Sequence, residues 1–441
     1  MRILVISKTV WSRENSFGNS YNNIFRGIKD LEFANVFCRQ GRPDCDVNLT
    51  RCFYIDQSKF IPNLFNRKIA TGHELVLNLQ SKVISDNKIS SHLLKEKKAL
   101  HDWVIRLGKI LRWQVFKWME DLHWKIGRWN SPELEKFIKD FQPDLLFMPV
   151  YYAMYMNDIV LWVKKLTNAP MLGYISDDNY TLRQFSLSPL FWIDRLWKRR
   201  KVKAVIDNCE ILYVISVIQK REYNQIFGEK CKVLTKMDDF DSPPPSWNYQ
   251  HRPLSLIYAG NIGTGRWKSL ALLAKAVERL NHEGMECNLD IYTSTPLSLW
   301  MRHALLRHGT VFHSPVSYYQ IIQLQKETDI LVHVEGLSFA SRLAVHQSFS
   351  TKLVDFFAMG KPILAIGTPD VASISYLIEN KAAMVVSDEQ TIYKKLKDII
   401  ENKKILIDYG QRSYECGKRF HNRKEIQTIL MNDFKTILNN M

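Results

Sequence analysis

One short segment combines glycines with cations, between an apolar run and a helical pattern. Gly260 and Gly263, with Asn261 between them, let the backbone approach a phosphate group closely. Arg266 and Lys268 follow and can offset the charge of such an anion. The spacing matches neither the P-loop nor the dinucleotide-binding glycine pattern, so a plain glycine-rich turn is an equally good interpretation.

A second segment joins a helix start to a lysine and an acid. Ser350 is expected to cap a helix, which places Thr351 and Lys352 in the first turn, where backbone N–H groups bind anions. Asp355 follows one turn later and can accept two hydrogen bonds from a ribose diol. Gly360 then ends the helix. The alternative is an ordinary capped helix with a solvated acid near its start.

The chain is long enough to hold these segments on two sets of strands and helices. Its 441 residues are 46% hydrophobic, which suits two α/β domains of ordinary size. Apolar runs alternate with helical patterns on both sides of a proline-rich stretch at 241–246, which is typical of parallel βαβ units. Residues 50–100 lack strand periodicity and are expected to form helices or long loops. The predicted strands are 3–6, 35–38, 145–149, 171–175, 211–215, 254–259, 287–292, 311–313, 330–334, 362–366 and 383–386.

The fold class predicted from this alternation is α/β, with two Rossmann-like domains whose parallel sheets face a central cleft. Residues 1–245 would form the N-terminal domain and 246–422 the C-terminal domain, followed by a terminal helix over 423–441. Parallel strands end at a common edge, and the helices that follow direct their N–H groups into the crevice there. Both chemical segments follow predicted strands, so we expect them to meet at that edge.

The region from Phe349 to Gly367 resembles the nucleotide-binding helix of family-4 (group 1) glycosyltransferases, which have the GT-B fold. The residues that carry the likeness are Phe349, Ser350, Thr351, Lys352, Asp355, Gly360, Pro362 and Gly367. The glycine segment and the helix after it resemble the first βα unit of the same family's C-terminal domain. The likeness extends over about residues 254–400 and implies that the C-terminal domain binds a nucleotide-sugar donor while the N-terminal domain binds the acceptor.

The resemblance also implies roles for single residues. In the family a basic pair in the glycine loop holds the donor diphosphate, and the acid at the position of Asp355 holds the ribose. Lys268 matches the family lysine, whereas Asn261 stands where the family has an arginine, for which Arg266 is a substitute. The family's first glutamate is replaced by Gln347.

Three carboxylates are candidates for catalytic work. Glu335, at the end of the strand 330–334, can reach the donor sugar, or it is an ordinary loop carboxylate. Asp177 and Asp178 follow another strand, where one of them can contact the acceptor hydroxyl or act as a base. Because neighbours in an extended segment alternate in direction, at most one is expected to face the cleft, and a turn with Asn179 is the alternative.

The N-terminal domain offers two small residues after its strands. The resemblance places Gly18, in a loop over 16–20, near the transferred sugar and the acceptor, with Asn19 or Ser20 capping the next helix. A flexible turn and cap is the alternative. Ser216 follows a later strand, where the family often has a small hydroxyl, and a simple helix cap explains it equally well.

The formal net charge of +16 favours an anionic partner such as nucleic acid, a membrane face or a phosphorylated substrate. Tryptophans and basic residues coincide over 103–129, within a helical insertion at about 95–130, and again over 191–201. Val115 and Leu122 recur at helical spacing in the first stretch. Both stretches are predicted to contact an anionic inner leaflet, and core-packed helices with solvated basic faces are the alternative.

The remaining sequence features bear on compartment and partners. The longest apolar stretch is too short to span a membrane, and no signal-peptide pattern begins the chain. Seven scattered cysteines without a C-x-x-C pair favour a reduced, cytoplasmic protein without a disulfide framework or a zinc site. No nucleic-acid recognition motif is found, so nucleic acid is not an expected partner. The two basic, tryptophan-rich stretches instead predict a cytoplasmic protein that is peripheral on the inner membrane face.

These observations predict a glycosyltransferase that moves a hexose from a UDP- or GDP-sugar to a hydroxyl of a lipid-linked or surface-polysaccharide saccharide. No cofactor or metal is required in this scheme, because cations and helix N–H groups stabilise the departing diphosphate. The resemblance implies retention at the anomeric carbon. The alternatives are a sugar-nucleotide epimerase of the same fold, a basic nucleic-acid-binding protein, and a non-catalytic protein that lacks the glutamate at position 347.

Overall fold

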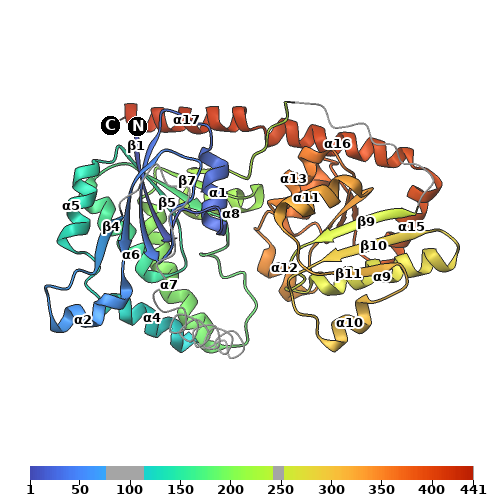
Figure 1. Ribbon diagram of the computed structural model, residues 1–441, viewed down its shortest axis with the longest axis horizontal. Helices are drawn as coiled ribbons and strands as arrows, with labels where there is room; N and C mark the ends of the chain where they lie inside the picture. The colour runs from blue at the N-terminus through green and yellow to red at the C-terminus, as the bar shows by residue number, and fades with distance from the viewer. Residues whose placement is uncertain (76–113, 242–252, 441) are drawn as a thin grey trace, which may run out of the picture.

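The computed structural model describes residues 1–75, 114–241 and 253–440, which form two α/β domains lying side by side (Figure 1). Each domain is a sheet with helices on both faces. The last helix passes from the C-terminal domain back to the N-terminal one, so both chain ends lie on the N-terminal domain. The predicted boundary near residue 245 lies outside the described residues.

The N-terminal sheet has eight strands in the order β4-β3-β2-β1-β5-β6-β7-β8. All described neighbours in it are parallel except β3 and β4, which pair antiparallel at one edge. Its strands are β1 (Arg2–Thr9), β2 (Glu32–Arg39), β3 (Leu49–Ile55), β4 (Gly72–Leu75), β5 (Leu145–Pro149), β6 (Met171–Ile175), β7 (Ile211–Val214) and β8 (Cys231–Val233). Its helices are α1 (Ser16–Phe25), α2 (Phe60–Phe65), α4 (Gln114–Ile126), α5 (Pro132–Phe141), α6 (Met154–Thr167), α7 (Pro189–Asp207) and α8 (Val217–Phe227).

The C-terminal sheet has six parallel strands in the order β11-β10-β9-β12-β13-β14, in which β9 and β12 flank the point where the chain reverses direction across the sheet. Its strands are β9 (Leu254–Ala259), β10 (Cys287–Tyr292), β11 (Thr310–His313), β12 (Ile330–Val334), β13 (Ile363–Ile366) and β14 (Met384–Val386). The helices are α9 (Arg266–His282), α10 (Leu299–Leu305), α11 (Tyr318–Glu327), α12 (Phe339–Val345), α13 (Lys352–Met359), α14 (Ala372–Glu379), α15 (Glu389–Glu401), α16 (Lys404–Phe420) and α17 (Arg423–Asn439).

Alternating side chains of the central strands build a core on each face of each sheet. In β1, Leu4 belongs to the core under α5 and α6, whereas Val5 belongs to the opposite core under α1. Leu430 and Phe434 of α17 complete that second core. The terminal helix is therefore part of the packing of the N-terminal domain, which couples the two ends of the chain.

The structure corrects the prediction for residues 50–100. Residues 50–100 were expected to lack strands, yet β3 and β4 form the edge of the N-terminal sheet. The strand signal is weak because Thr50 and Arg51 interrupt the apolar pattern. They are held instead by polar partners on the neighbouring strands, Glu32 and Glu74. All eleven predicted strands are present, and β8 is a further strand that the sequence did not reveal.

Candidate functional site

The glycine loop after β9 and the start of α13 come together at the carboxyl edge of the C-terminal sheet. Lys352, the first residue of α13, donates a hydrogen bond from Nζ to the carbonyl oxygen of Ala259 over 2.7 Å. A Cβ on Gly260 would lie 2.1 Å from that Nζ, and the φ of Gly260 is +158°. Only glycine therefore leaves room for the lysine at this place.

Protein atoms crowd the Lys352 ammonium even though the side chain is exposed overall. Burial lowers the pKa of Lys352, and the nearby Arg266 guanidinium lowers it further. Two cations thus lie close together at the mouth of the loop, where an anionic ligand would relieve their repulsion.

Arg266 is held by Glu335, which lies directly after β12. The guanidinium donates from Nε and Nη2 to the same carboxylate oxygen over 3.0 and 2.9 Å. Burial raises the pKa of Glu335, and the Arg266 charge opposes that change. The predicted meeting of the glycine loop and the end of the strand 330–334 is present in the structure.

His333 of β12 adds a buried imidazole to this group. Its Nε2 lies 3.4 Å from a carboxylate oxygen of Glu335, and it has no hydrogen-bond partner among the described residues. Burial lowers the pKa of His333 to about 3, with Arg266 and Lys352 adding to the effect. The ring is therefore neutral near pH 7, and its contact with Glu335 is not an ion pair.

Asp355 lies in the first turn of α13 and faces a residue from the last segment of the N-terminal domain. Lys236, which follows β8, forms an ion pair with the Asp355 carboxylate, and the Tyr318 hydroxyl lies 3.4 Å from the same oxygen. Burial raises the pKa of Asp355, while the Lys236 ammonium opposes the rise. No local pattern points to Lys236, because only the fold brings the segment after β8 to α13.

Other predicted residues of the loop serve its shape. The Asn261 side chain accepts a hydrogen bond from the backbone N–H of Gly263 over 2.6 Å and so closes the turn. Gly265 lies just before α9 at φ +79°, and a Cβ on it would lie 2.5 Å from the Ser341 hydroxyl. Lys268 is exposed, and its Nζ lies 5.6 Å from the centroid of the Trp267 ring. The cations that the structure places beside Glu335 are Arg266 and Lys352.

The start of α13 differs by one residue from the prediction. Thr351, not Ser350, occupies the cap position, and its side chain makes no capping hydrogen bond. The backbone N–H of Ser350 donates to the Ser373 hydroxyl over 2.9 Å. The tertiary contact with Ser373 holds Ser350 outside the helix, so the first turn begins at Lys352.

The two aspartates after β6 have different surroundings. Asp178 accepts hydrogen bonds from the backbone N–H groups of Tyr180 and Thr181 over 3.1 and 2.8 Å, and from the buried Arg195 over 3.2 Å. It therefore fixes the turn after β6, as the alternative interpretation proposed. Asp177 is exposed beside it, and the surrounding protein together with the Asp178 charge raises the pKa of Asp177. Of the two, Asp177 is the one with room for a ligand.

Gly18 lies within a helix and not in a loop. Asn15 caps α1 by accepting a hydrogen bond from the Gly18 N–H over 2.9 Å, which corrects the prediction that Asn19 or Ser20 is the cap. A Cβ on Gly18 would lie 2.0 Å from the carbonyl oxygen of Ser12. The glycine therefore permits the close approach of two backbone segments.

Ser216 and Gln347 join the two domains. The Ser216 hydroxyl caps α8 and also donates to the carbonyl oxygen of Gln347 over 2.7 Å. The Gln347 side chain is buried and donates to the carboxylate of Glu222 on α8. The residue that replaces the family glutamate thus contacts an acid of the other domain, which sequence reasoning did not detect.

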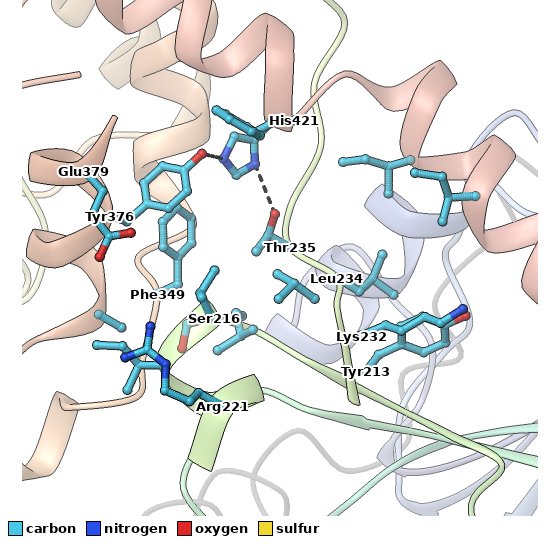
Figure 2. Close-up of a pocket in the computed structure, with 18 of the residues that line it drawn as sticks. Tyr213, Ser216, Arg221, Lys232, Leu234, Thr235, Phe349, Tyr376, Glu379 and His421 are labelled. Atoms are coloured by element: carbon cyan, nitrogen blue, oxygen red, sulfur yellow. Dashed lines mark hydrogen bonds between the residues drawn. The ribbon is translucent and has the colours of Figure 1, made fainter. Parts of the chain in front are cut away.

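A separate cavity of about 510 Å³ lies between the domains, where the chain crosses from β8 to the C-terminal domain (Figure 2). His421 spans it by contacting the Tyr376 hydroxyl at 2.9 Å and the Thr235 hydroxyl at 3.0 Å. Burial lowers the pKa of His421 to about 4, so these contacts involve a neutral ring. This network holds the crossing segment in place next to Lys236.

Comparisons with known proteins agree with this architecture. No protein-family model matches the sequence, and neither does any curated protein. Among solved structures, HepE from Anabaena in complex with UDP is similar at 10% identity and a TM-score of 0.60, covering 99% of this chain and 100% of that one. Sucrose-phosphate synthase from Thermosynechococcus elongatus is similar at 11% identity and a TM-score of 0.60, covering both chains fully. A glycosyltransferase from Rickettsia africae gives 13% identity, a TM-score of 0.56, and coverage of 100% and 99%. The chain has the fold of these proteins, the GT-B arrangement of two Rossmann-like domains.

Proposed function

We propose that this protein transfers a glycosyl group from a nucleotide diphosphate sugar to a hydroxyl acceptor. The observation that carries the proposal is the convergence of Lys352, Arg266 and Glu335 where β9 and β12 end. Open α/β sheets bind their ligands at such a crevice, and the adjacent N-terminus of α13 adds backbone N–H groups. The site thus combines fixed cations with a buried acid.

Departure of the diphosphate is the demanding part of this reaction, because negative charge grows on the leaving oxygen. Lys352 and Arg266 are already fixed by Ala259 and Glu335, so they can stabilise that charge without reorganising. Glu335 lies next to the cations and can accept hydrogen bonds from sugar hydroxyls. We assign UDP-sugars as the first donor class, since HepE, which shares the fold, is described in complexes with UDP and with UDP-glucose.

Asp355 is the residue proposed for the donor ribose. Its carboxylate can accept from two hydroxyls, but Lys236 already occupies one side of it. The donor ribose would therefore either share the Asp355 carboxylate with Lys236 or displace the Lys236 ammonium from it. Family-4 membership and retention of anomeric configuration remain part of this proposal, supported by the Phe349–Gly367 resemblance.

A membrane face is the proposed location of the acceptor. Helix α4 contacts both α2 and α7, and large apolar side chains of all three helices are exposed. Phe65 is 89% exposed and Met119 58% exposed, and α4 also carries the exposed basic residues Lys117 and Lys125. Val115 and Leu122 point outward instead of into a core, as contact with an anionic leaflet would require. Among the described helices, none is long and apolar enough to cross a membrane.

The donor proposal is tested by calorimetric titration of the purified chain with UDP, UDP-glucose, GDP, ADP and CMP. We expect UDP or GDP to bind, with the corresponding nucleotide sugar raising the thermal unfolding midpoint by mass action. Hydrolysis or transfer products in the presence of a saccharide identify a transferase, whereas an isomerised nucleotide sugar without acceptor identifies an epimerase. Failure of every nucleotide to bind overturns the proposal.

A further inference from the structure

The tryptophans of α4 turn inward around a cavity of about 210 Å³ in the N-terminal domain. Trp124 is fully buried and stacks on Tyr155 with ring centroids 4.2 Å apart, and Trp118 packs edge-on against Trp197 at 6.3 Å. Trp129 also lines the cavity. The tryptophans of this stretch therefore form most of the wall of a small site, to which Leu122 of α4 also contributes.

Two carboxylates share the cavity with these rings. Asp121 lies 3.1 Å from the Lys198 ammonium, and Asp158 lies 2.6 Å from that of Lys201. Each carboxylate has more acceptor sites than a single ammonium uses, so both can still accept hydrogen bonds from a ligand. The site therefore combines flat apolar surfaces with fixed hydrogen-bond acceptors.

The cavity lies at the same sheet edge as Asp177. Tyr155 belongs to the first turn of α6, shortly after β5 ends, and Glu120 of α4 lies 3.8 Å from Lys8 near the end of β1. β6, which precedes Asp177, pairs with β5. The aromatic cavity is thus placed on the ligand-binding edge of the N-terminal sheet.

We propose that this aromatic cavity binds one sugar ring of the saccharide acceptor, an inference that rests on the proposed function. The C–H faces of a pyranose suit the indole and phenol rings, and its hydroxyls suit Asp121 and Asp158. The volume is that of a site for one small ring and not for a nucleotide. An aliphatic chain would use none of the acceptor sites that the two carboxylates still offer.

The test follows tryptophan fluorescence during titration with the methyl glycosides of glucose, galactose, mannose and N-acetylglucosamine, with and without saturating UDP. We expect a saturable change with at least one glycoside. Trp197→Ala should weaken that binding about two- to tenfold, because an aromatic contact contributes about 0.5–1.5 kcal/mol. Trp197 is 54% exposed, so the variant should fold. Trp300→Ala is the matched control, since Trp300 is 83% exposed on α10 of the C-terminal domain.

The outcomes separate this inference from the function on which it rests. UDP binding without any glycoside response overturns the aromatic cavity as a sugar site and leaves the donor proposal intact. Equal glycoside affinity in Trp197→Ala and Trp300→Ala also overturns it. A glycoside response that Trp197→Ala weakens, in a protein that binds no nucleotide, supports the sugar site and overturns the proposed transfer.

Discussion

His346 of the C-terminal domain contacts Glu222 of the N-terminal domain, with Nε2 and a carboxylate oxygen 2.9 Å apart. The other ring nitrogen, Nδ1, faces the carbonyl oxygen of Asp370. Two acceptors around one imidazole favour the doubly protonated, charged ring. Arg183 also pairs with Glu222, so this carboxylate collects cations from both sides of the interface. The contact joins the two domains through a group that titrates near neutral pH.

From the contact between His346 and Glu222 we predict that the two domains separate more easily as the pH rises. The hydrogen bond that the ring donates to Glu222 raises the pKa of His346 above its ordinary value of 6.5, although burial opposes the rise. A raised histidine pKa stabilises the contact fully below the ordinary value, and the stabilisation is lost as the pH rises through the raised value. Small-angle scattering at about pH 6 and about pH 8.5 should show a larger radius of gyration at the higher pH. His346→Gln should remove this difference, and His303→Asn, a change at an exposed histidine, should keep it.

A second prediction concerns which lysine binds the donor diphosphate. Lys352→Met should weaken UDP binding at least about tenfold, because a charge-assisted hydrogen bond contributes about 1.5–3 kcal/mol. Lys268→Met should change it less than about twofold, since Lys268 is exposed and contacts Trp267. Calorimetric titration of both variants with UDP compares them directly. The reverse order of effects would restore Lys268 as the diphosphate ligand and remove Lys352 from that role.

Gly260 offers a test of the same site without any change of charge. Gly260→Ala places a Cβ 2.1 Å from the Lys352 Nζ, so the lysine must leave its contact with Ala259. We expect UDP affinity to fall about tenfold, with a loss of about 1–3 kcal/mol in the free energy of unfolding. Gly284→Ala is the control, because it also has a positive φ, +75°, but lies in open space. Equal UDP affinity in the two variants would contradict the proposed role of Lys352.

Glu335 is expected to matter for turnover more than for folding. Glu335→Gln keeps an oxygen that accepts from Arg266, so the thermal unfolding midpoint should change by only a few degrees. The transfer rate should fall at least about tenfold, because the carboxylate beside the donor is lost. Burial raises the pKa of Glu335, so wild-type activity should decline on the acid side at a higher pH than an ordinary glutamate would cause. A pH profile of kcat/KM in which Glu335→Gln keeps the wild-type acid decline would exclude Glu335 as its source.

The fold was predictable where strands are buried on both faces. The apolar runs of β5, β6 and β12 predict the bounds that the structure has, because a strand covered on both sides is buried along its whole length. The bounds of β9 and β10 were also predicted, although Ser255, Asn288 and Asp290 interrupt their apolar pattern. β3 was missed because Thr50 and Arg51 interrupt its apolar pattern, and β4 because this short edge strand carries the polar side chains of His73 and Glu74.

The site was predictable only in its local parts. Arg266 follows the glycine loop after β9, and Lys352 lies at a helix start, so pattern reasoning finds both. Lys236 and Glu222 reach α13 and Gln347 through the packing of distant segments, which no local pattern records. The resemblance placed Gly18 near the acceptor, and local reasoning left open which of Asp177 and Asp178 faces the cleft. Neither reveals that Asp178 and Gly18 already have partners within their own domain.

The last prediction concerns the exposed apolar surface of α2, α4 and α7. Phe65→Glu combined with Met119→Glu should lower flotation with anionic liposomes at least about tenfold, because each side chain loses about 1.5–3 kcal/mol of apolar burial and adds a repelled charge. High salt should also weaken wild-type binding, since basic neighbours such as Lys117 and Lys125 act through screened charge. Ile407→Glu, which is 59% exposed on α16, controls for a general effect of added acid. Wild-type protein that stays unbound at low salt would exclude this surface as a membrane contact, because both the apolar and the electrostatic attractions are then at their strongest.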